Sequence, residues 1–177
     1  MVYFYRMKIS GTYSAIANTD GRNTTWILVN TSEGKISFCD RDAIVKTWHC
    51  SIGKNGTGSA DGSGCTPLGI HRVVEKYGHG LPSRAVLKDR VFSGDVIDKT
   101  ATAANMVQSR IIRLAGCENG INKGNGVDTY QRFVYIHGAC REDLVGLPQS
   151  HGCITMINSE VIELFDLVSE GMIAAIV

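Results

Sequence analysis

The chain has 177 residues, of which 44% are hydrophobic and 20% charged, and its formal net charge is +1. This length and composition are typical of one globular domain rather than two. The 18 basic and 17 acidic residues form no basic stripe and no acidic tail. The charge pattern therefore argues against a nucleic-acid-binding protein.

Neither a membrane span nor a signal peptide is visible in the sequence. No stretch approaches the roughly 18 apolar residues that a membrane-spanning helix requires. Near the N-terminus, Arg6, Lys8, Ser10 and Gly11 interrupt the apolar run that a secretory signal needs. We treat residues 1–25 as an N-terminal segment of uncertain order and residues 26–177 as one folded domain.

The six cysteines are numerous for a chain of this size. An even number permits disulfide bonds, but one catalytic thiol would leave an odd number for pairing. No C-x-x-C pair is present, which argues against a thioredoxin-like site or a zinc ribbon. We expect most of the others to be small buried hydrophobic residues.

Short β-rich segments separated by Gly, Asn, Ser and Asp dominate the chain up to about residue 156. Residues 26–29 and 35–39 flank a Gly-containing loop and predict a hairpin. The glycines of residues 53–64 match no phosphate-binding pattern, so this stretch is predicted to be a plain loop. Residues 99–108 suit a short helix or a loop. Further strands are predicted over residues 43–52, 68–75, 106–114, 132–137 and 172–177.

One helix is predicted near the C-terminus. Asn158 is its expected N-cap and Gly171 its expected stop. Between them an apolar face recurs at helical spacing, formed by Val161, Ile162, Phe165 and Val168. Many short strands with one late helix predict a mainly-β, single-domain sandwich or barrel-like fold.

Two short motifs carry the chemistry: His137-Gly138 and, after a polar loop, Ser150-His151-Gly152-Cys153. A thiol with an ordinary pKa near 8.5 is mostly protonated at neutral pH, and a nearby imidazole can take its proton. Gly138 leaves room beside the imidazole, and a backbone carbonyl there could hold the second ring nitrogen. Gly152 would let the N–H groups of Gly152 and Cys153 point at a developing oxyanion.

These motifs resemble the active-site signature of the L,D-transpeptidase (YkuD-type) catalytic domain, a His followed at limited spacing by [Ser/Thr]-His-Gly-Cys. The resemblance extends to the T-P-x-G turn at residues 66–69, to the strand that ends in His137-Gly138, and to the helix over residues 161–171. The order of these elements agrees from about residue 26 to 177, which is most of the chain.

The resemblance implies acyl transfer on peptidoglycan stem peptides, in a bacterial periplasm or cell envelope. Cys153 would form a thioester with release of D-Ala, and His137 would act as general base and then as acid. An amine acceptor would give a 3→3 cross-link, and water would make the enzyme an L,D-carboxypeptidase. Ser150 and His151 would shape the wall that faces the substrate. The family is acylated by carbapenems, and the reaction needs no cofactor or metal.

One position departs from the family pattern and keeps other interpretations open. Thr155 stands where the family usually has Arg, which would orient or neutralise a carboxylate of the substrate. The chain could therefore be a catalytically impaired wall-binding domain of the same fold. A third interpretation is a tetrahedral zinc site, with ligands from His137, Cys140, His151 and Cys153.

Overall fold

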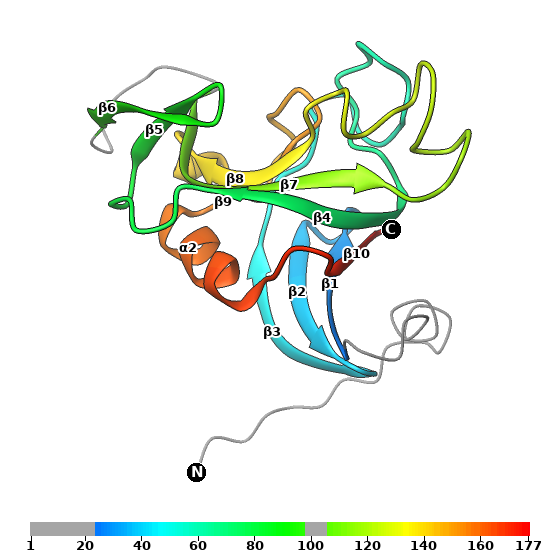
Figure 1. Ribbon diagram of the computed structural model, residues 1–177, viewed down its shortest axis with the longest axis horizontal. Helices are drawn as coiled ribbons and strands as arrows, with labels where there is room; N and C mark the ends of the chain where they lie inside the picture. The colour runs from blue at the N-terminus through cyan, green and yellow to red at the C-terminus, as the bar shows by residue number, and fades with distance from the viewer. Residues whose placement is uncertain (1–23, 98–105) are drawn as a thin grey trace.

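The computed structural model describes residues 24–97 and 106–177, which form one ten-stranded sheet and one α-helix (Figure 1). Eight strands follow the order β3-β2-β1-β10-β4-β7-β5-β6, and β8 joins this path through β7 and carries β9. The strands are β1 (Thr25–Asn30), β2 (Lys35–Asp40), β3 (Ala43–His49), β4 (Gly69–Tyr77), β5 (Ala85–Lys88), β6 (Val91–Val96), β7 (Val107–Gly116), β8 (Tyr135–Ala139), β9 (Ile154–Met156) and β10 (Ile173–Ile176). The predicted mainly-β class is confirmed, and residues 24–97 and 106–177 contain the one expected α-helix.

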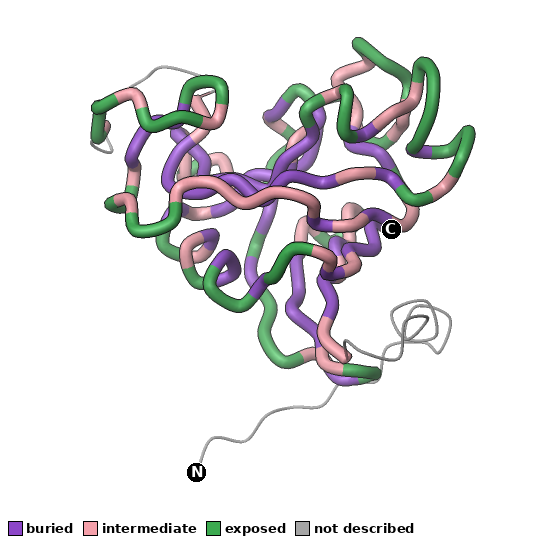
Figure 2. The backbone as a smooth tube through the Cα atoms, viewed as in Figure 1, coloured by how far each residue is buried: buried purple, intermediate pink, exposed green. Residues whose placement is uncertain are grey.

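The sheet bends so that its two halves enclose the helix α2 (Asn158–Leu167), as Figure 1 shows. Strands β1–β3 run steeply away from β4 and β7, and α2 lies in the angle between them. The core that fills this angle takes side chains from both halves and from α2, including Trp48, Ile112, Ile136, Leu164 and Phe165. In Figure 2 the buried backbone follows β7 and β8, whereas the loops beyond their ends are exposed.

The predicted hairpin of residues 26–39 is confirmed, since β1 and β2 pair antiparallel from Thr25 with Asp40 to Asn30 with Lys35. The other predicted strands are also present, with ends shifted by a few residues. Three strands were not predicted: β5, β6 and β9. β5 and β9 are short, with four and three residues, and β6 is largely exposed, so its side chains show no alternation of buried and exposed positions.

The prediction that Asn158 caps the helix is wrong. Asn158 is the first helical residue, Ile157 precedes it as the N-cap, and no side chain makes a capping hydrogen bond. The helix ends at Leu167, four residues before Gly171, which instead lies in the turn to β10 with φ +89°. Asn158 is unavailable as a cap because its buried amide is bonded to groups near the end of β8.

Some predictions concern residues that the structure does not describe. The N-terminal segment of residues 1–25 falls almost wholly outside the described residues, as does most of the ambiguous stretch of residues 99–108. The last two residues of the stretch 99–108, Val107 and Gln108, begin β7. In the described part of the chain, no helix has the length and apolar character to cross a bilayer.

Candidate active site

His137 lies in the middle of β8, with Ile111 of β7 opposite on one side and Thr155 of β9 on the other. Its ring is almost completely buried, with 6% exposed, and Nδ1 lies 3.0 Å from the carbonyl oxygen of Gly138. A carbonyl can only accept a hydrogen bond, so Nδ1 carries the proton and Nε2 keeps a lone pair. Burial lowers the pKa of His137 to about 4. The imidazole is therefore neutral at pH 7 and able to accept a proton.

Gly138 is held by a buried polar network below the imidazole. The Asn158 side-chain amide donates to the carbonyl of Ala139 at 2.8 Å, and the Ser109 hydroxyl donates to Asn158 Oδ1 at 2.5 Å. Glu142 accepts from both the backbone and the side-chain N–H groups of Asn158 and pairs with Arg84. The network fixes the carbonyl of Ala139, directly after the Gly138 carbonyl that sets the tautomer of His137.

This packing predicts that Gly138→Ala disrupts the site. A Cβ on Gly138 would overlap Asn158 Oδ1 and lie 2.7 Å from the backbone oxygen of Gln108. Because that oxygen belongs to β7, the strain cannot be relieved by a rotamer change, and we expect a loss of about 3 kcal/mol in the free energy of unfolding. Chemical denaturation of the variant measures this loss.

Gly120→Ala is the matched control, because its Cβ would meet no atom within 4 Å although φ is +74°. Only the backbone preference opposes this change, so we expect a loss of about 1 kcal/mol. Equal losses in the two variants would contradict the role given to the network around Gly138.

Cys153 immediately precedes β9 and is half-buried. The backbone N–H of Tyr135 donates to its Sγ at 3.4 Å, and the thiol donates to the carbonyl of Phe133 at 3.5 Å. Burial raises the pKa of Cys153 to about 11, against smaller opposing effects from the Tyr135 N–H and the Arg132 guanidinium. Burial thus favours the neutral thiol and the neutral imidazole over a thiolate–imidazolium pair at pH 7.

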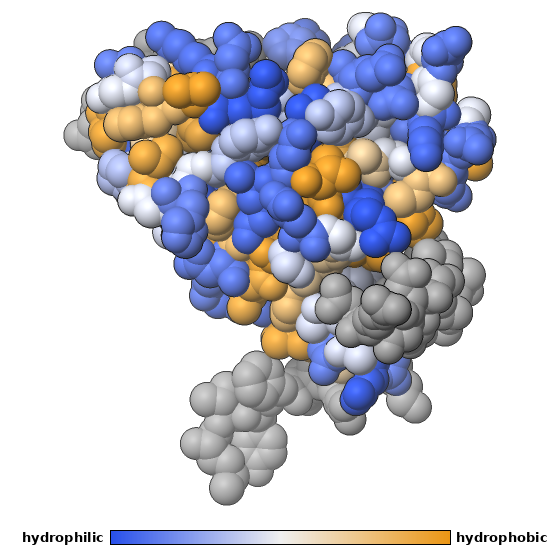
Figure 3. Space-filling model, in the orientation of Figure 1, coloured by the Kyte–Doolittle hydropathy of each residue, from blue (hydrophilic) through white to orange (hydrophobic). Residues whose placement is uncertain are grey.

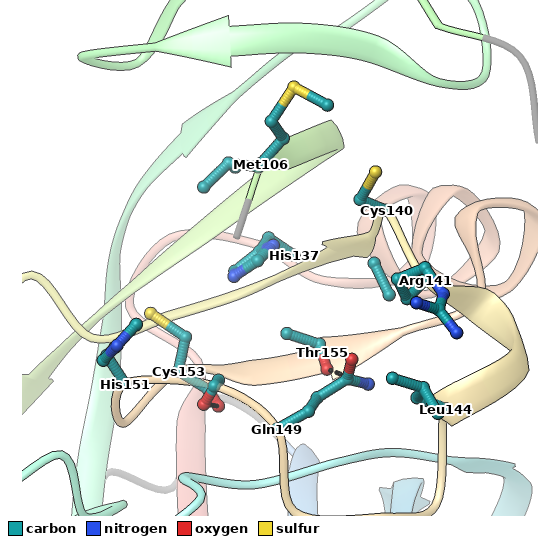
Figure 4. Close-up of a pocket in the computed structure, with 12 residues that line it drawn as sticks. Met106, His137, Cys140, Arg141, Leu144, Gln149, His151, Cys153 and Thr155 are labelled. Atoms are coloured by element: carbon teal, nitrogen blue, oxygen red, sulfur yellow. Dashed lines mark hydrogen bonds between the residues drawn. The ribbon is translucent and has the colours of Figure 1, made fainter. Parts of the chain in front are cut away.

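His137 and Cys153 line one pocket of about 230 Å³. Figure 4 shows the Cys153 sulfur and the His137 ring directed towards the same space, with His151 beside the sulfur and Cys140 at the other end. The motifs that the sequence placed sixteen residues apart therefore meet through the parallel pairing of β8 with β9. The remaining walls come from Met106, Val107, Ala139, Arg141, Leu144, Gln149, Ser150 and Thr155.

The loop before Cys153 is held in place by two hydroxyl groups. Ser150 Oγ donates to the carbonyl of Cys153 at 2.5 Å and accepts from the N–H of Gly152 at 3.1 Å. Thr66, from the T-P-x-G turn, donates to the carbonyl of Gly152 at 3.0 Å. Gly152 has φ +123°, and a Cβ there would lie 2.9 Å from the carbonyl of Cys65, so glycine is required.

The oxyanion donors differ from the expectation. The N–H of Gly152, expected to face an oxyanion, already donates to Ser150 Oγ. The N–H of Cys153 remains as the candidate donor of the two. His151 lines the pocket and is exposed, and its Nε2 lies 3.4 Å from Lys54 Nζ, so it faces solvent rather than the core.

Thr155 faces the pocket with a short neutral side chain. It is 5% exposed, and its Oγ1 lies 3.4 Å from Gln149 Nε2, which also donates to Ser51 Oγ at 3.0 Å. No cation stands at this position. Two residues near the thiol were not predicted from the sequence. The backbone carbonyl of Phe133 accepts a hydrogen bond from Cys153, and the positive charge of Arg132 lowers the pKa of the thiol slightly.

The cysteines do not form the zinc site considered above. Among the described residues, no group of three or more His, Cys, Asp or Glu side chains is arranged to hold a metal ion. Cys140 and His151 point into opposite ends of the pocket (Figure 4). No disulfide bond joins any of the six cysteines, all of which lie in the described part of the chain, and Cys39, Cys50 and Cys140 are buried. Burial raises the pKa of Cys39 and Cys50 to about 12, as expected for structural thiols.

The bent sheet and the His–Cys pocket define the class of the L,D-transpeptidase catalytic domain. The YkuD family model, described as the L,D-transpeptidase catalytic domain, matches residues 24–176. The chain belongs to this family. No curated protein sequence matches the chain at a significant level.

Solved structures share the fold at low sequence identity. An L,D-transpeptidase from Mycobacterium smegmatis is 16% identical with a TM-score of 0.55, over 87% of this chain and 58% of that one. The Bd1075 protein of Bdellovibrio bacteriovorus is 16% identical with a TM-score of 0.56, over 91% and 50%. L,D-transpeptidase 3 from Mycobacterium tuberculosis, in complex with a faropenem-derived adduct, is 14% identical with a TM-score of 0.53, over 86% and 60%. The chain thus spans between half and two thirds of these proteins.

Proposed function

We propose that the protein is a cysteine acyltransferase that acts on peptidoglycan stem peptides in a bacterial cell envelope. The observation that carries this proposal is the joint position of Cys153 and His137 on one pocket, with His137 Nε2 as the free ring nitrogen. The family membership supports the reaction class, and the faropenem-derived adduct of the Mycobacterium tuberculosis protein supports reactivity with β-lactams.

In the first half-reaction, His137 Nε2 takes the proton of the Cys153 thiol as Sγ attacks the carbonyl carbon that precedes D-Ala. The N–H of Cys153 donates to the resulting oxyanion. The C–N bond then breaks, His137 returns its proton to the leaving amine, and a thioester remains on Cys153. Since both groups start neutral, the thiolate forms only as the attack proceeds.

In the second half-reaction, an acceptor amine enters the space that D-Ala has left and attacks the thioester. His137 takes a proton from the amine, and the thiol is regenerated when the C–S bond breaks. An amine of a neighbouring stem peptide yields a 3→3 cross-link, and water yields carboxypeptidase activity. The same chemistry admits a protein lysine or a free D-amino acid as acceptor.

Covalent labelling with a carbapenem tests this function directly. We expect the intact protein, kept under reducing conditions, to gain the mass of one carbapenem, because ring opening transfers the whole molecule to Sγ. Peptide mapping should place the added mass on Cys153. A protein that stays unmodified at millimolar carbapenem would instead support a catalytically impaired wall-binding domain, the alternative raised by Thr155.

A further inference from the structure

A second pocket, of about 310 Å³, lies beside the nucleophile. Its walls include Leu87, Ile111 and Tyr135, and Cys153 packs against these same three residues. Tyr135 also donates its backbone N–H to Cys153 Sγ. Val107 lines both pockets, whereas His137 lines only the first. The thiol therefore lines the first pocket and packs against the walls of the second, and only the first pocket contains the general base.

Arg90 is the positively charged residue that lines this second pocket, and its sequence neighbour Asp89 is the negatively charged one. Its Nη1 donates to the hydroxyl of Tyr135 at 3.1 Å, and its guanidinium lies 5.6 Å from the ring centre of Phe133. In the described part of the chain, no carboxylate forms a salt bridge with it, and its neighbour Asp89 exerts the smallest of the effects on the pKa of Arg90. The guanidinium is thus positioned by neutral groups and left able to pair with an anion.

Arg113, which lies near the same aromatic ring as Arg90, differs from Arg90 in its ion pairing. It lies 5.1 Å from the ring centre of the same Phe133, but its Nη1 forms a salt bridge of 2.8 Å with Glu75. It also donates to the carbonyl of Tyr130. Its charge is therefore matched within the protein, whereas the charge of Arg90 faces the pocket.

The backbone around Arg90 is held in an unfavourable conformation. Asp89 and Arg90 form the two-residue turn between β5 and β6, with φ of +49° and +70°. Such turns favour glycine at the second position, where Arg90 stands. Phe133, which contacts both arginines and the Cys153 thiol, also has a positive φ, at +54°. Strained non-glycine residues cluster at functional sites, where the side chain is needed in that place.

This hairpin exposes two valines beside the exposed charged residues Lys88, Asp89 and Asp95. Val91 is 68% exposed and Val96 55%, and Figure 3 shows hydrophobic side chains gathered over the β5–β6 end of the molecule. A guanidinium beside the apolar and aromatic wall of the pocket is suited to bind one anionic group of a ligand, whose remaining parts contact that wall.

The position of His137 decides which part of the substrate reaches Arg90. The leaving amine and the acceptor amine both exchange a proton with His137, so both occupy the first pocket. The acyl part that stays on Cys153 can then extend past Leu87, Ile111 and Tyr135, against which the sulfur packs, towards the second pocket. We propose that Arg90 binds a carboxylate on this retained acyl part, which makes Arg90 a specificity-determining residue of the reaction proposed above. Thr155 cannot bind a substrate carboxylate through a positive charge in the first pocket. Arg90 would provide that charge in the second pocket.

Arg90→Gln tests the inference with two tetrapeptide donors of the stem type. In one donor the carboxylates other than the C-terminal one are free, and in the other they are amidated. We expect kcat/KM for release of the C-terminal residue to fall about 10- to 100-fold for the free-carboxylate donor, the range for a lost charge-assisted hydrogen bond. The amidated donor should change by less than about threefold. Lys88→Gln, which removes a cation from the same hairpin, should keep the preference of the unmodified protein.

Equal losses on both donors, or no loss on either, would overturn the assignment of Arg90. Failure of the unmodified protein to release the C-terminal residue from either donor would count against the proposed function instead. In that case the alkylation of Cys153 by anionic iodoacetate, relative to neutral iodoacetamide, still tests Arg90. We expect the rate ratio to fall about threefold in Arg90→Gln, and an unchanged ratio would overturn the inference.

Discussion

Cys153→Ala is expected to abolish both the carbapenem adduct and peptide turnover, while the protein stays folded. The sulfur is the atom that attacks, and no neighbouring group in the pocket can replace it as a nucleophile at this position. Because Cys153 is half-buried and contacts the protein through two weak sulfur hydrogen bonds, we expect a loss of only about 1 kcal/mol in the free energy of unfolding. Intact mass and circular dichroism check the two expectations.

Cys140→Ala is the matched control for this experiment. Cys140 is a second thiol on the same pocket, and it follows His137 by three residues. It is 7% exposed and lies at the opposite end of the pocket from His151 (Figure 4). The adduct should persist in Cys140→Ala with its full mass. An adduct that persists in Cys153→Ala and disappears in Cys140→Ala would show that Cys140, and not Cys153, is the nucleophile.

The fold was predictable from the sequence where the physical signal is local. Alternating and β-branched runs predicted the hairpin of β1 and β2, and apolar spacing predicted a helix within residues 158–168. The hairpin of β5 and β6 was missed because Asp89 and Arg90 replace the glycine that marks such turns. A turn stabilised by its tertiary surroundings carries no local signature.

The site was predictable only in part, for the same reason. His137, Gly138 and the Ser150–Cys153 motif were identified because they are close in sequence to one another and typical of a family. Asn158 was assigned to the helix cap from its position, but its amide is bonded to Ala139, nineteen residues away. Such long-range hydrogen bonds depend on the sheet order, which the sequence did not reveal.

The pKa values also could not be predicted from the motif. A His beside a Cys suggested a thiolate stabilised by an imidazolium ion. Burial instead raises the pKa of Cys153 to about 11 and lowers the pKa of His137 to about 4. Each group is neutral because its charged form would lose hydration in the closed pocket. In the reaction proposed here, the thiol therefore loses its proton to His137 as it attacks.

His137→Gln is expected to slow carbapenem acylation of Cys153 by about 10²- to 10⁴-fold, the range for a lost general base. Glutamine can keep the hydrogen bond to the carbonyl of Gly138, but it has no nitrogen that accepts the thiol proton. In the unmodified protein, the imidazole must be neutral to act, so the rate should fall only as the pH drops towards 4, the pKa of His137. The variant should lose this acid limb.

The stability of the protein gives a second readout of the same residue. The folded-state pKa of His137 lies below the ordinary value of 6.5, so the unfolded chain binds the proton first. The stabilisation is therefore complete above pH 6.5 and declines as the pH falls towards 4. His71, whose pKa burial also lowers to about 4, adds to this decline. Denaturation at pH 7 and pH 4.5 should show a smaller loss in His137→Gln than in the unmodified protein.

His79→Gln separates these effects from the loss of any histidine. His79 is exposed and lies outside the pocket, so its replacement should leave the acylation rate and its acid limb unchanged. If His137→Gln acylated within tenfold of the unmodified protein, another group would have to accept the proton of Cys153. His137 is the one buried histidine that lines this pocket. This result would therefore contradict the role of His137 as the general base.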